Sequence, residues 1–340
     1  TARVDSTGDN ILYAVWKANN DTAYKVEFYC EQTDGAYTLA KTDPRTGTTD
    51  ATVSVTDTDK GYGTPTYVYD EGNTNNLESG TVAADGSLTL KLYFKRNTAE
   101  YTIHHYLKGT EVKVAPDQTG TMTIGDTLTA SASTALGAEY TSAHANSYSP
   151  SQSLKMEATG NVITVYYTVP LTITAESASR AYNAQPLTQP DFKVEGLVNG
   201  DQKKDITLSM TKESTITNVG SVSNVIDTTT VLFKGGALPG GYYELPTYQP
   251  GTLTITPNTD EVTVTITGNH DTLVYNGSEQ SVTGYTTDVG EKTISVTLKE
   301  GSKAEAKGTN AGKYDMGLTK DNFTVTSQNY SNIKVVVVDG

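Results

Sequence analysis

The sequence repeats itself, and this repetition limits the fold more than any other feature. The segment AYKVEFY at residues 23–29 is matched by EYTIHHY at residues 100–106, a spacing of 77 residues. Three further segments share a turn with glycine followed by an alternating strand rich in aromatic residues: 8–16, 85–94 and 160–168. We interpret the first kind as the opening strand of a small module and the second kind as its closing strand.

The second half of the chain repeats a different unit at an offset of about 92 residues. The matched pairs are 171–177 with 262–268, 181–187 with 274–280, 217–222 with 309–314, and 240–257 with 327–340. Together the two kinds of repeat predict modules at 21–98, 99–169, 170–257 and 258–340, preceded by residues 1–20 as the tail of a truncated repeat. Tyr13 and Trp16 in this tail are expected to pack on residues 21–98 or on a neighbouring molecule.

Composition agrees with a mainly β chain. Tyrosine (22 residues) far outnumbers phenylalanine (5 residues), and 30 glycines supply turns. Tyrosine, threonine and valine suit half-exposed strands, and no long stripe of helical period is present. We therefore expect an elongated tandem array of small β-grasp-like or immunoglobulin-like sandwich modules. Residues 126–136 are a weak candidate for a short helix.

Alternation along the two opening strands predicts which side chains enter the core, because successive side chains of a strand point to opposite faces. Val26 and Phe28 share one face, and Ile103 and His105 take their places in the second copy. We expect this face to be buried, so that His105 is a core residue rather than a ligand. Cys30 lies on the same face and is expected to be a buried, inert thiol.

Charge and cysteine content restrict the partners. The net charge of −14 and the isoelectric point near 4.7 make nucleic acid an unsuitable partner, because an acidic surface repels phosphate. Cys30 is the single cysteine, so no intrachain disulfide forms.

No apolar run has the roughly 18 residues of a membrane-spanning helix. The first residues lack the layout of a signal peptide and the end lacks an anchor motif, so we expect a monomeric internal segment of a longer protein.

Several motifs of the first half resemble families of bacterial surface repeats. Residues 99–169 resemble mucin-binding-protein (MucBP-type) repeats, and residues 21–98 resemble them less closely. The resemblance rests on YTIHHYL at 101–107, KVAPD at 113–117, IGDTLT at 124–129 and GNVITVYY at 160–167. Residues 11–20, ILYAVWKANN, resemble the end of the Listeria–Bacteroides (InlB B-type) repeat.

Residues 170–340 resemble the MBG/YDG-type repeats of bacterial surface proteins. The motifs are VEGLVNGD at 194–201, LTITP at 253–257, YNG at 275–277 and TNAGKY at 309–314. Asn183 and Asn276 depart from this family, in which aspartate is common at that position.

These resemblances imply an extracellular protein of the Gram-positive cell wall without catalytic activity. The implied function is a stalk or adhesive segment that holds a binding head away from the wall. Two alternatives stay open: a module that binds host mucin glycans or extracellular proteins, and an accessory region of a large carbohydrate-active enzyme.

The residues that could carry catalysis form no recognisable active-site pattern, which favours a protein that is not an enzyme. The four histidines, His104, His105, His144 and His270, form no pattern of nucleophile and base or of metal ligands, so no cofactor is expected. Asp57, Asp59 and Gly61 resemble a fragment of a calcium loop, but the later acidic ligands are missing, which favours a solvated turn. A Lys–Asn isopeptide crosslink occurs in some Gram-positive surface domains, and the spacing here singles out no pair.

Candidate ligand-binding residues lie on the outward face of the opening strands. Tyr29 stands beside Glu27, and Tyr106 stands beside His104. An exposed tyrosine can stack on a sugar ring while neighbouring polar groups bind sugar hydroxyls. We therefore place a ligand site at Tyr29, Tyr106 and His104, within 21–169 rather than 170–340. The alternative is that these tyrosines only cover neighbouring strands or a seam between modules.

Overall fold

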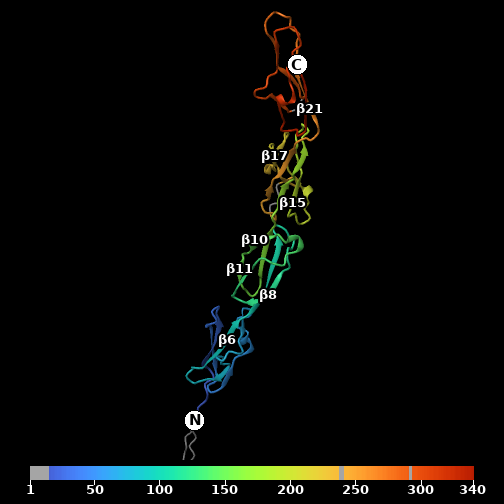
Figure 1. Ribbon diagram of the computed structural model, residues 1–340. Helices are drawn as coiled ribbons and strands as arrows, with labels where there is room; N and C mark the ends of the chain where they lie inside the picture. Colours follow the sequence, from blue (N-terminus) through green and yellow to red (C-terminus); the bar gives the residue numbers. More distant parts are fainter. Residues whose placement is uncertain (1–14, 237–240, 291–292) are drawn as a thin grey trace, which may run out of the picture. The chain divides into compact units, whose positions relative to one another are not determined.

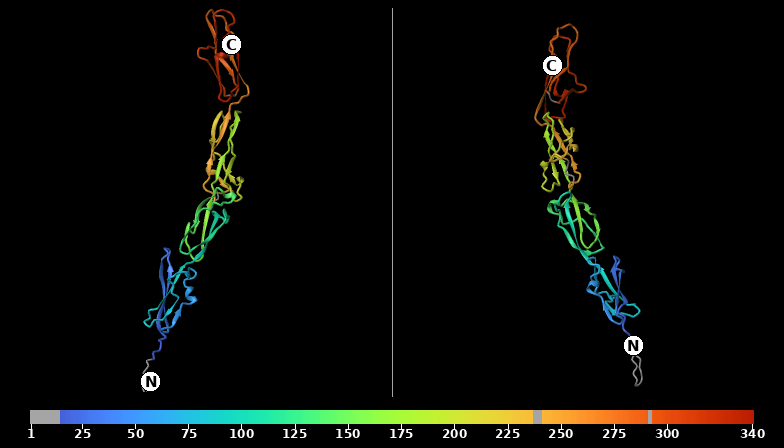
Figure 2. Two further views of the ribbon diagram at one scale, coloured as in Figure 1. Left: turned by 60° about the horizontal axis from the view of Figure 1, so that its bottom comes forward. Right: turned by 180° about the vertical axis from the view of Figure 1, so that it is seen from behind.

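The computed structural model describes residues 15–236, 241–290 and 293–340. These residues belong to two compact units, Thr1–Thr168 and Val169–Gly340 (Figures 1 and 2). Strands make up nearly all the regular structure of both units, as predicted. In the described part of the chain no helix has the length and apolar character needed to cross a membrane.

Residues 22–96 form a four-stranded mixed sheet and a separate two-stranded sheet. The larger sheet has the order β2-β1-β6-β4, and β1 pairs with β6 in parallel and with β2 antiparallel. In the smaller sheet β3 pairs antiparallel with β5. The elements are β1 (Thr22–Glu31), β2 (Tyr37–Gly47), β3 (Thr52–Ser54), α1 (Asp57–Lys60), β4 (Tyr67–Tyr69), β5 (Ser79–Thr81) and β6 (Thr89–Arg96).

Residues 98–168 repeat this topology. Their larger sheet has the order β10-β12-β7-β8, β7 pairs with β12 in parallel, and β9 pairs antiparallel with β11 in a separate two-stranded sheet. The elements are β7 (Thr98–Leu107), β8 (Gln118–Thr123), β9 (Thr127–Thr129), η1 (Ala138–Tyr140), β10 (His144–Ser149), β11 (Ser153–Lys155) and β12 (Asn161–Thr168). The repeat at 77 residues in the sequence is therefore also a repeat of strand order and direction. The central parallel pair matches the β-grasp-like alternative.

The buried face of the two opening strands agrees with the prediction from alternation. Val26, Phe28, Ile103 and His105 are all buried, and so is the thiol of Cys30. These side chains form the core because they lie on the same, inward face of their sheets.

The predicted helix at 126–136 is wrong. Thr127–Thr129 forms β9, and no helix is present at residues 130–136. This strand forms because Leu128, which stands between two β-branched threonines, is buried where it pairs with Leu154 of β11.

Residues 171–257 form two three-stranded sheets, as in a sandwich. The sheets have the orders β15-β13-β19 and β14-β20-β17, and β16 pairs with β18. The chain passes from one sheet to the other at Pro250, between β19 and β20. The elements are β13 (Thr172–Ala175), β14 (Ala178–Ala181), β15 (Phe192–Glu195), η2 (Lys203–Asp205), β16 (Ile206–Thr207), β17 (Gly220–Asn224), η3 (Thr228–Thr230), β18 (Leu232–Phe233), β19 (Thr247–Gln249) and β20 (Gly251–Thr256).

Residues 262–340 repeat part of this arrangement. The sheet β23-β21-β27 corresponds to β15-β13-β19, and two antiparallel two-stranded sheets accompany it, β22 with β25 and β24 with β26. The last strand, β27, thus takes the place of β19 and not of β20. The elements are β21 (Val262–Gly268), β22 (Gln280–Thr283), β23 (Tyr285–Asp288), β24 (Ser295–Leu298), β25 (Glu305–Gly308), η4 (Lys320–Asn322), β26 (Phe323–Thr326) and β27 (Ile333–Val338).

All four repeats share one pairing rule: the opening strand pairs in parallel with a strand from the end of the same repeat. The parallel pairs are β1 with β6, β7 with β12, β13 with β19, and β21 with β27. Because the two strands run in the same direction, the chain enters the sheet at one end and leaves it at the other.

The tail at residues 1–20 is only partly described. Residues 1–14, with Tyr13, lie outside the described residues. Trp16 has 91% of its surface exposed. It therefore does not pack on residues 21–98, which was one of the two expectations for it, and contact with a neighbouring molecule stays a prediction.

Replacement of Ile163 by alanine is expected to lower the free energy of unfolding of residues 97–168 by about 2–5 kcal/mol, because Ile163 is fully buried on β12. Val162→Ala is the matched control, since Val162 precedes it on the same strand and is 41% exposed. The control should cost about 1 kcal/mol or less. Urea unfolding of both variants measures the difference, and equal losses would contradict the assigned inward face.

Candidate functional site

The outward face of β1 and β6 carries three tyrosines in contact. Tyr29 and Tyr93 are register partners in the parallel pair, and their rings stack with centroids 4.8 Å apart and planes 9° apart. Tyr37 of β2 meets Tyr93 edge-on, with centroids 5.3 Å apart. All three side chains are half-buried, so one part of each ring packs and another part faces solvent. We call Tyr29, Tyr37 and Tyr93 the tyrosine cluster.

Charged groups border the tyrosine cluster. The Tyr29 hydroxyl donates a hydrogen bond of 2.7 Å to Glu27 Oε2, and Lys25 Nζ donates one of 2.6 Å to Glu27 Oε1. Lys91 Nζ lies 6.0 Å from the centroid of the Tyr29 ring. The Tyr37 hydroxyl donates a hydrogen bond of 2.8 Å to Asp70 Oδ2 on another side of the cluster.

These contacts shift the pKa values of Tyr29, Glu27 and Tyr37. The hydrogen bond to Glu27 raises the pKa of Tyr29 to about 12. Hydrogen bonds from Lys25 and then from Tyr29 lower the pKa of Glu27. Burial, followed by the hydrogen bond to Asp70, raises the pKa of Tyr37 to about 12. At neutral pH Tyr29 and Tyr37 are therefore neutral and Glu27 is charged, which gives flat aromatic surfaces beside fixed hydrogen-bonding groups.

The second copy places a related set on β7 and β12. Tyr106 and Tyr166 are register partners at the position that corresponds to Tyr29 and Tyr93. The His104 ring lies 5.7 Å from the Tyr106 ring, centroid to centroid. His104 Nδ1 lies 3.0 Å from Asp117 Oδ1, and Lys113 Nζ lies 2.8 Å from Asp117 Oδ2.

The pKa of Asp117 is lowered by the hydrogen bond from Lys113 and then by His104. The structure thus brings His104 and Tyr106 together, while Tyr29 belongs to the equivalent face of the first copy.

Sequence reasoning missed the partners of these candidates. Tyr37, Tyr93 and Tyr166 come from other strands, and Asp70 follows β4. A signal was present, since LYF and VYY in the two closing segments each contain a tyrosine on the alternate face. This signal could identify the partner of Tyr29 only once the parallel register was known, because the register places Tyr93 opposite Tyr29.

His105 has a structural role on the opposite face of β7. Its side chain is fully buried, and Nδ1 lies 2.9 Å from Tyr167 Oη. The same oxygen accepts a hydrogen bond of 2.7 Å from the Ser133 amide, so the hydroxyl proton is free to point at Nδ1. Burial lowers the pKa of His105 because the charged ring would lose its hydration.

The calcium-like segment is a small structural unit and not the expected solvated turn. Asp57–Lys60 forms α1, and Asp59 accepts hydrogen bonds from Thr56 N (2.8 Å) and from both terminal nitrogens of Arg45. The hydrogen bonds from Arg45 are the main cause that lowers the pKa of Asp59 to about 2. No group of three or more His, Cys, Asp and Glu side chains suited to a metal ion occurs among residues 15–236, 241–290 and 293–340.

Comparison with known proteins finds similarity only among solved structures. No family model matches the chain, and no curated protein matches it. The type 2 repeat of the mucus binding protein MUB from Lactobacillus reuteri is 15% identical and has a TM-score of 0.18, with 43% of this chain and 98% of that chain covered. The structure of Mub-RV is 18% identical and also has a TM-score of 0.18, with 43% of this chain and 97% of that chain covered.

The burial of His105 predicts a pH-dependent stability of residues 97–168. Its folded pKa lies below the ordinary value of 6.5, so the stabilisation is present above pH 6.5 and is lost as the pH falls toward the folded pKa. His105→Phe places the residue type of Phe28, its equivalent in the first copy, at this site. The variant should remove a slope of at most about 1.4 kcal/mol per pH unit below pH 6.5.

Urea unfolding between pH 7 and pH 5, with hydrogen exchange to follow residues 97–168, measures this slope. His144→Phe is the control for the loss of a histidine outside the core, because His144 is exposed at the start of β10. Equal slopes in the wild type and in His105→Phe would show that His105 does not carry the pH dependence.

Proposed function

We propose that this chain is a repeat region of a bacterial cell-surface protein of the Gram-positive wall, where it acts as an extracellular spacer with adhesive faces. The observation that carries the proposal is the parallel pairing of opening and closing strands in all four repeats. Each repeat then receives the chain at one end of its sheet and passes it on at the other, so that repeats can be added in series. In this proposal the modules run over 21–98, 99–169, 170–257 and 258–340, and the region has no catalytic role.

We propose a second function for residues 21–169, the binding of mucin-type glycans. It is favoured by the tyrosine cluster and by the equivalent pair Tyr106 and Tyr166. Half-buried rings are held rigid by their packing, which lowers the entropy lost on binding. Their open surfaces can stack on sugar rings, and Asp70 or His104 can bind sugar hydroxyls, whereas Glu27 is buried and holds the Tyr29 hydroxyl in place. The MucBP-type resemblance is confined to the same half of the chain.

A spacer of serial modules predicts that the two units fold independently. Residues 15–168 and residues 169–340, produced separately, should each unfold within about 3 °C of the corresponding transition in the whole chain. The reason is that each unit contains its own complete sheets and core. Calorimetry measures the transitions. A unit that is unfolded alone would contradict the spacer proposal.

Glycan binding is expected from residues 15–168 and not from 169–340. Tyr93→Ala should weaken binding about three- to tenfold, because it removes the ring that stacks on Tyr29 and meets Tyr37. Tyr93→Phe keeps the ring and should bind as the wild type does. Tyr314→Ala is a control outside the tyrosine cluster, because it removes a tyrosine that is more exposed than Tyr93, at 43%.

Mucin and a glycan array serve as ligands, and the melting temperature of each variant confirms folding. Equal binding by both halves, or binding by 169–340 alone, would reject this placement of the site.

A further inference from the structure

A loop at residues 70–76 interrupts the edge of the first sheet directly beside the tyrosine cluster. β4 pairs with β6 as far as Phe94, and the pairing resumes at Lys91, which bridges to Leu77. Tyr93 lies between these two points and contacts both other rings of the tyrosine cluster. The loop therefore leaves the sheet opposite the ring that joins the cluster together.

The side chain of Asn76 holds both ends of this loop to Tyr93. Asn76 Oδ1 accepts a hydrogen bond of 2.9 Å from the Tyr93 amide, and Asn76 Nδ2 donates one of 2.8 Å to the Asp70 carbonyl oxygen. The Asp70 amide donates a hydrogen bond of 2.9 Å to the Tyr93 carbonyl oxygen. In an uninterrupted antiparallel pair, two facing residues exchange both backbone hydrogen bonds. Here the Asn76 amide group is inserted into one of the two, between the Asp70 carbonyl and the Tyr93 amide.

This attachment places the polar side chains of the loop against the tyrosine cluster. Asp70 Oδ2 accepts a hydrogen bond of 2.8 Å from the Tyr37 hydroxyl and one of 3.3 Å from Asn73 Nδ2. Asn73 Oδ1 accepts a hydrogen bond of 3.0 Å from the Asn75 amide, which fixes the orientation of the Asn73 side chain. Asp70 and Asn73 are half-buried. A carboxylate has about four acceptor positions and an amide has two donor hydrogens, so both groups can also bond to a ligand.

The second copy has a strand where the first has this loop. Apart from one bulge, β10 covers the corresponding edge, and Ser147 is the register partner of Tyr166, the counterpart of Tyr93. Asp117, the carboxylate beside His104, is paired with Lys113. The two copies therefore share the tyrosine pair and differ in the polar groups at its border.

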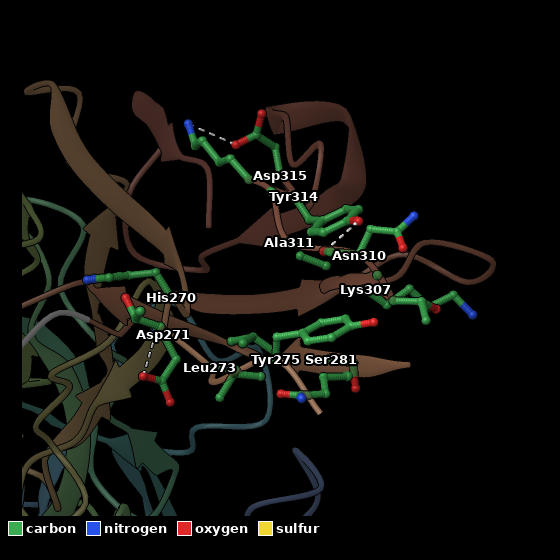
Figure 3. A pocket seen from close by; sticks show the side chains of 18 of the residues that line it. His270, Asp271, Leu273, Tyr275, Ser281, Lys307, Asn310, Ala311, Tyr314 and Asp315 are labelled. Atoms are coloured by element: carbon green, nitrogen blue, oxygen red, sulfur yellow. Dashed lines mark hydrogen bonds and ion pairs between the residues drawn. The ribbon is translucent and has the colours of Figure 1, made fainter. Parts of the chain in front are cut away.

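Exposed tyrosines alone do not make such a site, as the last repeat shows. Figure 3 shows Tyr275 and Tyr314 on opposite sides of a groove, where they are 64% and 43% exposed. The Tyr314 hydroxyl donates a hydrogen bond of 3.1 Å to the Asn310 carbonyl oxygen, and Asp315 Oδ1 lies 3.0 Å from Lys313 Nζ. The tyrosine cluster differs, because a carboxylate held by a loop bonds directly to a ring hydroxyl.

The chemistry of the loop favours a neutral sugar with adjacent hydroxyl groups. The apolar face of the sugar can lie on the open part of the cluster rings while one hydroxyl donates to Asp70 and its neighbour accepts from Asn73. Residues 70–76 contain two carboxylates, Asp70 and Glu71, and no lysine or arginine. An anionic sugar would bring like charges together at this border, which disfavours binding.

We propose that the loop 70–76, positioned by Asn76, makes residues 22–96 selective for neutral sugars with adjacent hydroxyls over acidic sugars. This inference rests on the proposed glycan binding and assigns the ligand class of that site. Asp70 and Asn73 contact the sugar, whereas Asn76 is a positioning residue that acts through Asp70 and Tyr93. The second copy is not expected to share this selectivity.

The test follows the Tyr93 amide resonance of the whole chain, labelled with isotope-enriched tyrosine, so that binding by the second copy does not interfere. A galactose-terminated oligosaccharide is compared with the same oligosaccharide capped on the primary hydroxyl of galactose by N-acetylneuraminic acid. The cap keeps the adjacent hydroxyls and adds a negative charge, so the neutral form should bind at least about fivefold more tightly. Equal affinities would overturn the selectivity. Tighter binding of the capped form would assign recognition to Lys91 beside Tyr29 and would also overturn it.

Two variants separate the roles of charge and position. Asp70→Asn keeps the shape and removes the charge, and should bring the two affinities closer together. Asn76→Ala removes the acceptor of the Tyr93 amide, whose hydrogen exchange should become at least about tenfold faster. The affinity of Asn76→Ala for the neutral oligosaccharide should fall about tenfold.

Asn75→Ala is the matched control, because Asn75 is an exposed asparagine of the same loop and alanine keeps its backbone hydrogen bond to Asn73. It should change neither the exchange of Tyr93 nor the affinity, and the melting temperature confirms that each variant is folded.

The outcomes distinguish this inference from the glycan binding on which it rests. A wild-type chain that binds neither oligosaccharide would refute glycan binding at the tyrosine cluster and the ligand class with it. The exchange of Tyr93 would then still decide whether Asn76 positions the loop. Wild-type binding that persists unchanged in Asn76→Ala would leave glycan binding in place and overturn the role of the loop.

Discussion

The parallel pairing of an opening strand with a closing strand is the interaction on which the rest of this structure depends. In the first two repeats it joins residues that lie sixty or more positions apart, such as Lys25 with Thr89 and Tyr101 with Asn161. Closing so long a loop costs entropy, and the burial of one face of both strands offsets this cost. The remaining strands attach to the two sides of this central pair, so each repeat has one core and two ends.

The two faces of the central parallel strand pair have different structural roles. The inner face tolerates exchange of one core residue for another, as Phe28 is replaced by His105, whose ring finds the Tyr167 hydroxyl as partner. The outer face keeps a pair of tyrosines in register but changes the polar groups beside them from Glu27 to His104. A common scaffold can therefore present related aromatic surfaces with different hydrogen-bonding and charge properties, which suits a repeat region with adhesive faces.

The sequence by itself determined the mainly β class, the two kinds of repeat and the buried faces of the opening strands, since alternation and local turns are properties of neighbouring residues. It misjudged residues 126–136 and Asp59, whose states depend on the distant partners Leu154 and Arg45. Only the tertiary structure decided that Tyr93 stacks on Tyr29 and that β27 corresponds to β19. Both outcomes rest on the register between strands far apart in the chain, and a shift of one residue would have turned every side chain to the other face.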